Sequence, residues 1–307
     1  MPRAATFLSG PSYVLGEDEV DHSAIENLSE LASQFKLASQ PGLWGWGTIR
    51  TTKRELADLA AETGVATLRA AGITPSSVEA LVLCSNRIPG PAEGHGQLVA
   101  DVLTGIGLGD IPAYGVNLNR CVNLLAGIDV AQAFVLSGRY RRVLVITTDK
   151  VAEGADRMSQ FALFSDGAAS CVITADEAQA ASFELLGCAT AQDTATLDWN
   201  NQISSDLARQ VNEQLLAAPG LKLGDVTALM HANLFTPLVV MKERQAGFRT
   251  DQLYLDNITR IGHCFAADPL INLVDRTARG HLENGGYCVL ASSVPGSRIG
   301  ALLRVLS

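Results

Sequence analysis

The sequence predicts an α/β protein made of two related halves, and two observations support this fold class. The first is a strand–helix–strand pattern in residues 114–149. An extended segment begins at Tyr114, apolar residues recur at helical spacing over 124–135, and a short β-branched run follows at 143–146. The second is that parts of the chain recur later in the same order.

The internal repeat consists of two matching pairs of segments. Residues 71–83 and 219–231 each contain a helix end, a turn, a Val-x-Ala-Leu motif and a strand, displaced by 148 residues. Cys121 and His263 each lie 17 residues before a glycine that precedes an apolar strand. Two copies of one strand–helix unit would place Cys121 and His263 at equivalent helix starts, facing one active centre.

The first half is expected to span residues 1–178 and the second residues 179–307, with the two meeting near residues 175–182. Apolar runs predict the strands of the first half, and 3.6-residue periodicity predicts its helices. Besides the segment from Tyr114, strands are expected at 7–15, 78–84, 143–146 and after the turn at 165–167, and helices at 21–37, 54–71, 98–103 and 121–138.

The second half is predicted in the same way. A strand at 226–230 leads into His231-Ala-Asn233, and a strand at 253–257 leads towards Gly262-His263. The other strands are expected at 183–190, 287–292 and 299–306, and the helices at 204–216, 238–246 and 270–278.

Composition excludes several classes of function. The chain has 307 residues, 47% of them hydrophobic and only 18% charged, so it can bury a large core and rest against a partner subunit. No apolar run approaches the ~20 residues of a membrane span, and the N-terminus lacks a signal peptide's apolar stretch. Six cysteines without a CxxC pair indicate reduced thiols in the cytoplasm and no metal site. A net charge of −9 argues against nucleic acid as a partner.

Cys121 is the candidate nucleophile. At a strand-to-helix junction its thiol can point out of the end of the sheet, where the helix N-terminus favours the thiolate. His231, at a strand end, is the candidate general base. Three other cysteines lie inside apolar runs and are expected in the core: Cys84, Cys171 and Cys288. Three histidines lack such a context and are expected at the surface or in loops: His22, His95 and His281.

A glycine-rich loop at 40–47 carries Trp44 and Trp46. Aromatic side chains in such a loop either line the mouth of a ligand site or pin the loop to the core. The sequence leaves both roles open.

Together these features resemble the thiolase superfamily, and more narrowly its β-ketoacyl-acyl-carrier-protein synthase III branch. The resemblance covers nearly the whole chain and is carried by four groups of residues: Cys121 in its turn, Asp156-Arg157 with 163–169, His231-Ala-Asn233, and Gly262-His263 with 266–268. It implies a five-layered αβαβα fold, a homodimer, and a cysteine that takes an acyl group from coenzyme A or a carrier protein, with no tightly bound cofactor.

The chain departs from the family pattern at two places. Condensing members carry an asparagine after the glycine of the third catalytic loop, where this chain has His263. The family's glycine-rich C-terminal loop, which helps to build the acyl pocket and oxyanion hole, is replaced here by residues 292–297. Members from secondary metabolism with His-x-x-x-x-Asp in the third loop transfer acyl groups to a hydroxyl or amine, and residues 263–268 are similar to that pattern.

The resemblance therefore implies an acyltransferase of secondary metabolism, related to enzymes of polyketide or fatty acid biosynthesis. An acyl group would pass from a coenzyme A or phosphopantetheine thioester, through an acyl-cysteine, to a small-molecule acceptor. The expected catalytic residues are the nucleophile Cys121, the base His231, and His263, which either orients the pair or serves as a second base. Asp268 is expected to hold an imidazole tautomer, as the third member of a triad does. Asp268 before Pro269 equally fits a helix cap. The expected substrate-binding residues are Asn233, Arg157, Trp44 and Ser292.

Two other functions stay open. A decarboxylating condensing enzyme would join two acyl units, and a non-catalytic subunit would complete the pocket of a heterodimer. The histidine in place of asparagine argues against the first, and the intact Cys121 and His231 argue against the second.

Overall fold

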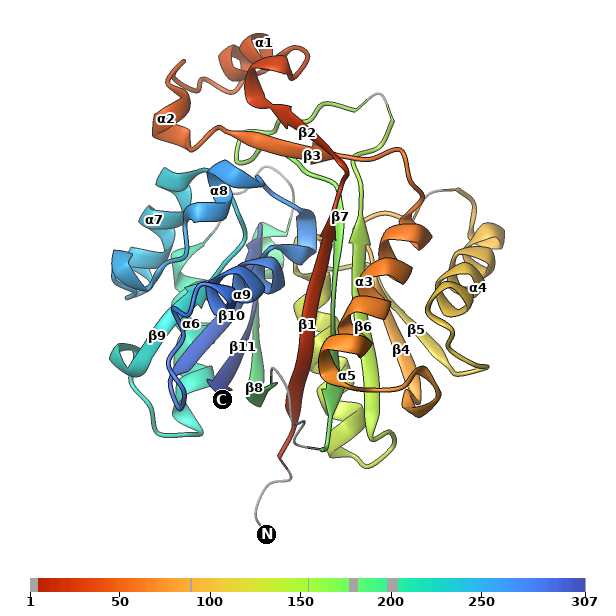
Figure 1. Ribbon diagram of the computed structural model, residues 1–307. Coiled ribbons are helices and arrows are strands. Elements are labelled where there is room, and N and C mark those ends of the chain that lie inside the picture. Colours follow the sequence, from red (N-terminus) through yellow and green to blue (C-terminus); the bar gives the residue numbers. More distant parts are fainter. Residues whose placement is uncertain (1–4, 89, 154, 177–181, 198–203, 307) are drawn as a thin grey trace.

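The computed structural model describes residues 5–88, 90–153, 155–176, 182–197 and 204–306. Within these ranges, strands join into one nine-stranded mixed sheet in the order β5-β4-β6-β7-β1-β8-β11-β10-β9 (Figure 1). The strands are β1 (Phe7–Leu15), β4 (Ala80–Cys84), β5 (Ala113–Val116), β6 (Arg142–Asp149), β7 (Gly167–Thr174), β8 (Ser182–Gln192), β9 (Val226–Met230), β10 (Tyr287–Val294) and β11 (Ser297–Val305).

The strand order repeats across the middle of the sheet. In the first half β4 is parallel to β6, and β7 pairs antiparallel with both β6 and β1. In the second half β9 is parallel to β10, and β11 pairs antiparallel with both β10 and β8. Leu253 makes a single parallel bridge to Leu229 of β9. This bridge occupies the position that the pairing of β5 with β4 occupies in the first half. The two halves meet where β1 pairs with β8, which confirms the predicted repeat.

The helices form three layers around the two half-sheets. Helices α3 (Leu56–Ala71) and α4 (His95–Ile106) cover the first half, and α6 (Ser205–Ala217) and α7 (Thr236–Gln245) cover the second. Between them, α5 (Asn123–Leu136) and α9 (Asp268–Ala278) each contact strands of both halves. The predicted five-layered αβαβα fold is therefore confirmed.

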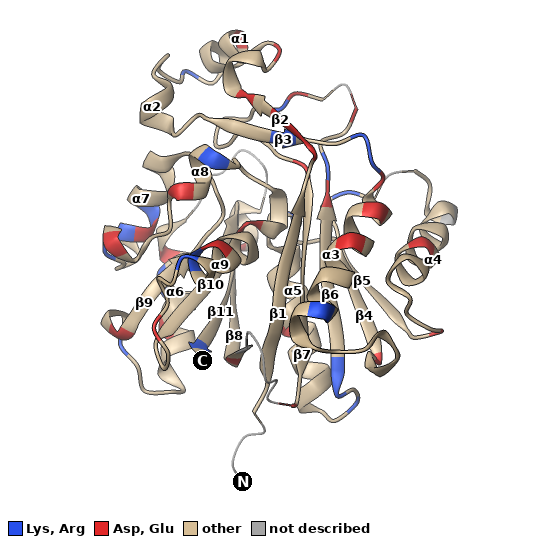
Figure 2. Ribbon diagram, in the orientation of Figure 1, with Lys and Arg blue, Asp and Glu red and all other residues tan. Residues whose placement is uncertain are grey.

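The predicted division at residue 178 falls on 177–181, which lie outside the described residues. The ranges 1–178 and 179–307 therefore remain a proposal. Charged residues are scarce on the central strands and more frequent on the outer helices and loops, as the ribbon colours in Figure 2 show. This distribution follows from the cost of burying charge in the apolar interior of a packed sheet.

One predicted helix, 21–37, is wrong for most of its length. Only α1 (Leu28–Gln34) is helical there, because Asp21 caps a 3₁₀ turn through Ser23 and Asn27 adopts a left-handed φ of 58°. With α2 (Pro41–Trp44), inside the predicted loop, and the ribbon of β2 (Asp18–Asp21) and β3 (Thr48–Thr51), this segment forms a cap at one end of the sheet.

The predicted strand at 253–257 is also wrong. After the single bridge of Leu253 the chain turns into the short helix α8 (Asp256–Arg260). The buried Asn257 on α8 donates to Asn272 of α9 at 2.9 Å, so this segment is held by side-chain contacts with the central layer rather than by a strand ladder.

Candidate active site

Cys121 lies in a 3₁₀ turn, Arg120–Val122, that leads directly into α5. Arg120 before it has a φ of 55°, a conformation that costs free energy for a residue with a side chain. The Arg120 guanidinium donates to the Pro295 carbonyl at 2.9 Å, and the Ser292 hydroxyl donates to the Cys121 carbonyl at 3.1 Å. Both contacts tie the turn to the β10–β11 hairpin. The predicted position of Cys121 at a strand-to-helix junction is thus what the structure has, and its side chain is 7% exposed.

His263 is brought to this turn by the backbone of the third loop. Its N–H donates to the Leu163 carbonyl at 2.8 Å, and its own carbonyl accepts from the Ser165 N–H at 2.9 Å. Gly262 before it has a φ of +75°, and a Cβ there would lie 2.8 Å from the Leu163 carbonyl oxygen. Only glycine permits this close approach. The Leu-Phe-Ser-Asp-Gly segment thus acts as the support for the third loop.

The imidazole of His263 joins Cys121 to Asp268. Its Nδ1 donates to Asp268 Oδ2 at 2.5 Å, and the ring also interacts with the Cys121 side chain. Burial disfavours the imidazolium, but the Asp268 carboxylate and then Cys121 outweigh it and raise the pKa of His263 to about 10. Cys121, His263 and Asp268 therefore form a buried group of a thiol, an imidazole and a carboxylate.

Asp268 is not the cap of α9 that the sequence allowed, because it is the first residue of the helix, the N-cap is Ala267 and no side chain caps this end. Its Oδ1 instead accepts the N–H of Cys264 at 2.7 Å. Its Oδ2 accepts from His263 and also from the backbone N–H of Asn233 at 2.6 Å. One fully buried carboxylate thus connects the third loop with the loop that follows β9.

His231 lies at the end of β9 with its ring fixed in one tautomer. Nδ1 donates to the Ala232 carbonyl at 2.8 Å, and burial lowers the pKa of His231, so the ring is neutral. Its Nε2 therefore carries a lone pair, and this buried atom has no hydrogen-bond partner among the described residues. His231 is able to accept a proton, but the imidazole that the structure pairs with Cys121 is His263.

The sequence repeat aligns Cys121 with His263, but the backbone before the two helices aligns Cys121 with a different residue. The left-handed residues before α5 and α9 are Arg120 and Phe265, with φ values of 55° and 50°. By this backbone feature the residue matching Cys121 is Ala266, whereas His263 lies three residues earlier, beside Phe164. The repeat thus places Cys121 in the first of these turns and His263 in the loop that leads to the second.

Three of the predicted substrate-binding side chains make contacts within the protein. Arg157 makes a two-pronged ion pair with the buried Asp166, at 2.7 and 2.9 Å. Asn233 donates to the Gly262 carbonyl at 3.0 Å. Trp44 donates through Nε1 to the Ala38 carbonyl at 2.8 Å. Their roles towards substrate remain predictions, as does that of Ser292 beside Cys121.

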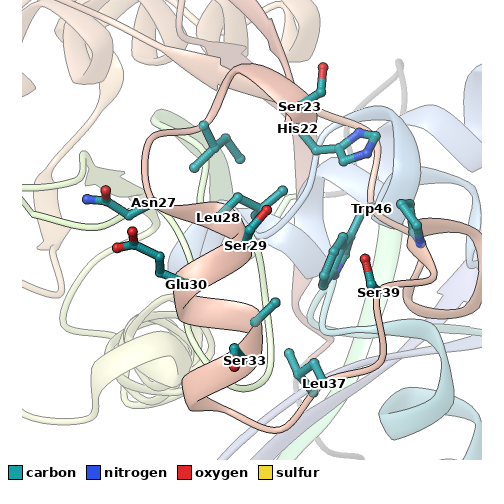
Figure 3. Close-up of a pocket in the computed structure, with 13 residues that line it drawn as sticks. His22, Ser23, Asn27, Leu28, Ser29, Glu30, Ser33, Leu37, Ser39 and Trp46 are labelled. Atoms are coloured by element: carbon teal, nitrogen blue, oxygen red, sulfur yellow. The ribbon is translucent and has the colours of Figure 1, made fainter.

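A cavity of about 630 Å³ opens in the cap, next to α1 (Figure 3). Its lining includes Trp46, whose ring centroid lies 6.0 Å from that of Phe235 in the loop after β9, which supports the pinning role of the tryptophan loop. Serine hydroxyls and the Glu30 carboxylate line the cavity, which has no lysine or arginine in its lining.

Two groups near the site were missed in the sequence. Asn272 lies four residues after Asp268 on α9, a spacing that places both on one helix face and was the available signal. The second group is an ion cluster of Lys242 and Glu243 on α7 with Arg298 on β11, all buried. No local pattern distinguishes a charged helix residue that faces a sheet from one that faces water.

Comparison with known proteins finds similar sequences and similar folds. Residues 117–193 match the family of 3-oxoacyl-[acyl-carrier-protein (ACP)] synthase III. The β-ketoacyl-[acyl-carrier-protein] synthase III of Fusobacterium nucleatum is 30% identical over 118 residues, or 38% of this chain and 35% of that protein. The Listeria monocytogenes enzyme of the same name is 22% identical over 80% of this chain and 82% of its own length. In sequence and fold the chain is similar to ketosynthase III-like proteins of the thiolase superfamily.

Solved structures share the fold over nearly the whole chain. ChlB3, described as an acyltransferase, superposes with a TM-score of 0.84 at 17% identity, covering 99% of this chain and 98% of its own. The 3-oxoacyl-[acyl-carrier-protein] synthase III of Aquifex aeolicus gives 0.79 at 16% identity, covering 98% and 100%. Alignments with the Fusobacterium and Porphyromonas gingivalis synthases span only 35% and 48% of those proteins. None of the described helices is long and apolar enough to cross a membrane.

The raised pKa of His263 predicts a pH dependence of stability. The folded value of about 10 lies above the unfolded value of about 6.5, so the stabilisation is complete below pH 6.5 and is lost as the pH rises towards 10. Urea unfolding at several pH values should show the free energy of unfolding falling across this window. His263→Asn should lack this component, and equal slopes in both proteins would contradict the ionised state of His263.

Proposed function

We propose that this ketosynthase III-like protein is an acyltransferase that acylates Cys121 from a coenzyme A or carrier-protein thioester. The acyl group then passes to a hydroxyl or amine of a small-molecule acceptor. The observation that carries the proposal is the alignment of Cys121, His263 and Asp268, with an imidazole beside the nucleophile. Transfer of this kind needs a nucleophile, a proton carrier and oxyanion donors, and no other cofactor.

Protons balance in the first half-reaction when His263 begins as an imidazolium. The Cys121 thiolate attacks the thioester carbonyl, and the carbon–sulfur bond to the donor breaks. His263 gives its proton to the departing thiolate, which leaves as a thiol, and Cys121 holds the acyl group as a thioester. Asp268 keeps Nδ1 protonated throughout, so the exchange takes place at the ring nitrogen facing Cys121.

The second half-reaction returns the proton. Neutral His263 accepts it from the acceptor hydroxyl or amine as this attacks the acyl carbonyl, and Cys121 leaves as a thiolate beside the restored imidazolium. His231, with its free Nε2 lone pair, is proposed to accept a hydrogen bond from the incoming acceptor and orient it. This assignment moves the main base from His231, the residue favoured by sequence, to His263.

The proposal excludes decarboxylation. Condensing relatives stabilise a thioester enolate with paired histidine and asparagine donors, and losing one such donor costs on the order of 10²- to 10³-fold in rate. Here His263 occupies the asparagine position and is engaged by Asp268. Acylated wild-type protein mixed with malonyl-coenzyme A should therefore release no carbon dioxide above the Cys121→Ala background. Release matched by a β-ketoacyl product would establish the condensing function instead.

A homodimer is part of the proposal. Low charge and the closely related family fold favour an apolar surface covered by a second copy. Light scattering at micromolar concentration is expected to give about twice the chain mass of 32.4 kDa. A monomer of 32.4 kDa would contradict this assignment and leave the acyltransferase proposal to be judged on its chemistry.

A further inference from the structure

A chain of buried amide side chains runs behind the two histidine loops. Asn272 of α9 donates through Nδ2 to the His231 carbonyl at 2.8 Å and to Asn233 Oδ1 at 2.9 Å. Asn233 in turn donates to the carbonyl of Gly262, the residue before His263, at 3.0 Å. Asn272 is completely buried. It therefore contacts the backbone of one histidine loop directly and that of the other through a single side chain.

The direction of this chain is set at its outer end. Arg260 can only donate, and its Nη1 bonds to Asn257 Oδ1 at 2.7 Å. The Asn257 amide nitrogen must then be the donor to Asn272 Oδ1, at 2.9 Å. This leaves both N–H groups of Asn272 for His231 and Asn233. Arg260 therefore fixes the orientation of the linked amides of Asn257, Asn272 and Asn233. The last of them donates to the Gly262 carbonyl, which can only accept.

Arg260 is itself held in place, although its side chain is 51% exposed. Its Nη1 also contacts Asp275 Oδ2 at 3.1 Å, and Asp275 Oδ1 accepts from the Tyr13 hydroxyl at 2.7 Å. The chain thus begins at a surface arginine secured by α9 and β1 and ends beside the reacting groups. Because the Arg260 side chain is exposed, it can be removed by substitution without leaving a cavity in the core.

We infer that Asn272 is a positioning residue. The hydrogen-bonded series Arg260–Asn257–Asn272–Asn233 sets the distance between the two histidine loops, and this distance in turn sets the position of the His263 ring relative to Cys121. Because the buried amides face oxygen atoms on both sides, no apolar or anionic side chain at 272 reproduces the contacts. The inference concerns the geometry of the pair and holds for acyl transfer and for condensation alike.

The test uses iodoacetamide, which alkylates Cys121 without any acyl substrate, and follows the adduct by intact-protein mass spectrometry. An imidazolium beside the thiol promotes alkylation at neutral pH, so a displaced His263 slows it. Asn272→Leu is expected to lower the rate constant at pH 7 about tenfold, the equivalent of about 1.4 kcal/mol. Asn212→Leu, a matched buried asparagine on α6 whose amide donates to the Ala246 carbonyl, should leave the rate unchanged.

Asn272→Asp provides a pH signature that a purely structural role would not produce. An ionised carboxylate at 272 would face the His231 carbonyl and Asn233 Oδ1, two acceptors, whereas the protonated acid can donate to one of them. The rate relative to wild type should therefore recover as the pH falls from 8 to 5. A constant ratio over this range would overturn the inference.

Arg260, at the exposed end of the hydrogen-bonded series, can be replaced without changing the core. Arg260→Ala should slow alkylation about two- to fivefold, because the amides lose their fixed direction. Arg279→Ala removes a neighbouring surface arginine that pairs with Asp256, and it should have no effect. Equal rates for both variants and wild type would show that Arg260 does not orient the chain. A failure of acyl transfer with these alkylation results intact would reject the proposed function and leave the positioning role standing.

Discussion

Replacing Cys121 with alanine is expected to abolish covalent acylation and to reduce turnover by about 10⁵- to 10⁶-fold, the scale on which loss of a nucleophile acts in comparable triads. The physical reason is that no other described thiol sits against an ionised imidazole. Burial instead raises the pKa values of Cys84, Cys171, Cys264 and Cys288 and holds these thiols in the unreactive protonated form. The acyl adduct is measured by intact-protein mass spectrometry after incubation with a panel of acyl thioesters.

The histidine variants distinguish the roles within the same experiment. His263→Ala should suppress acylation nearly as strongly as Cys121→Ala, because the thiolate loses its counterion and the leaving thiol loses its proton donor. His231→Ala should still acquire the adduct, though slowly, and fail to pass it on. If Cys121→Ala forms the acyl adduct to the same extent and at the same rate as wild type, Cys121 is not the nucleophile.

Glu243→Gln is expected to destabilise the fold by about 3–5 kcal/mol, the cost of removing one partner from a buried ion pair. The Glu243 carboxylate accepts from Arg298 at 2.7 and 3.1 Å and lies 2.9 Å from the Lys242 ammonium, and all three side chains are buried. Burial raises the pKa of Glu243, but Arg298 and then Lys242 outweigh it and lower this pKa to about 2. Glutamine would leave two buried cations without an anion.

Thermal and urea unfolding of Glu243→Gln measure this effect. The matched control is Asp251→Asn, which breaks an exposed pair with Arg249 and should cost no more than about 1 kcal/mol. Similar small changes in both variants would show that the buried cluster is not a major source of stability. The cluster also holds Ser293 through Arg298 at 3.0 Å, and Ser292 beside it bonds to Cys121 on the opposite face of β10. Some loss of activity should therefore accompany the loss of stability.

The cap shows where local sequence rules stop working. Residues 21–37 have helical periodicity, yet a left-handed Asn27 and the pairing of β2 with β3 leave only seven residues in helix α1. The ribbon is selected by contacts made far away in sequence. Asp166, for example, accepts the backbone N–H of Thr52 at 2.9 Å and two bonds from Arg157. A pattern confined to a window of residues does not contain such contacts.

The sequence by itself determined the repeated α/β architecture, the bounds of β1 and β9, and the position of Cys121 at the start of a helix. These features follow from periodicity and turn chemistry, which act between near neighbours in the chain. Only the tertiary structure decided that His263 rather than His231 meets Cys121, and that Asn233 and Arg157 bond to the protein itself. The proximity of Cys121 to His263 depends on the packing of α5 and α9 between the two half-sheets, which brings together residues more than a hundred positions apart. The bonds of Asn233 and Arg157 join residues 29 and 9 positions apart, and they depend on how the loops fold against one another.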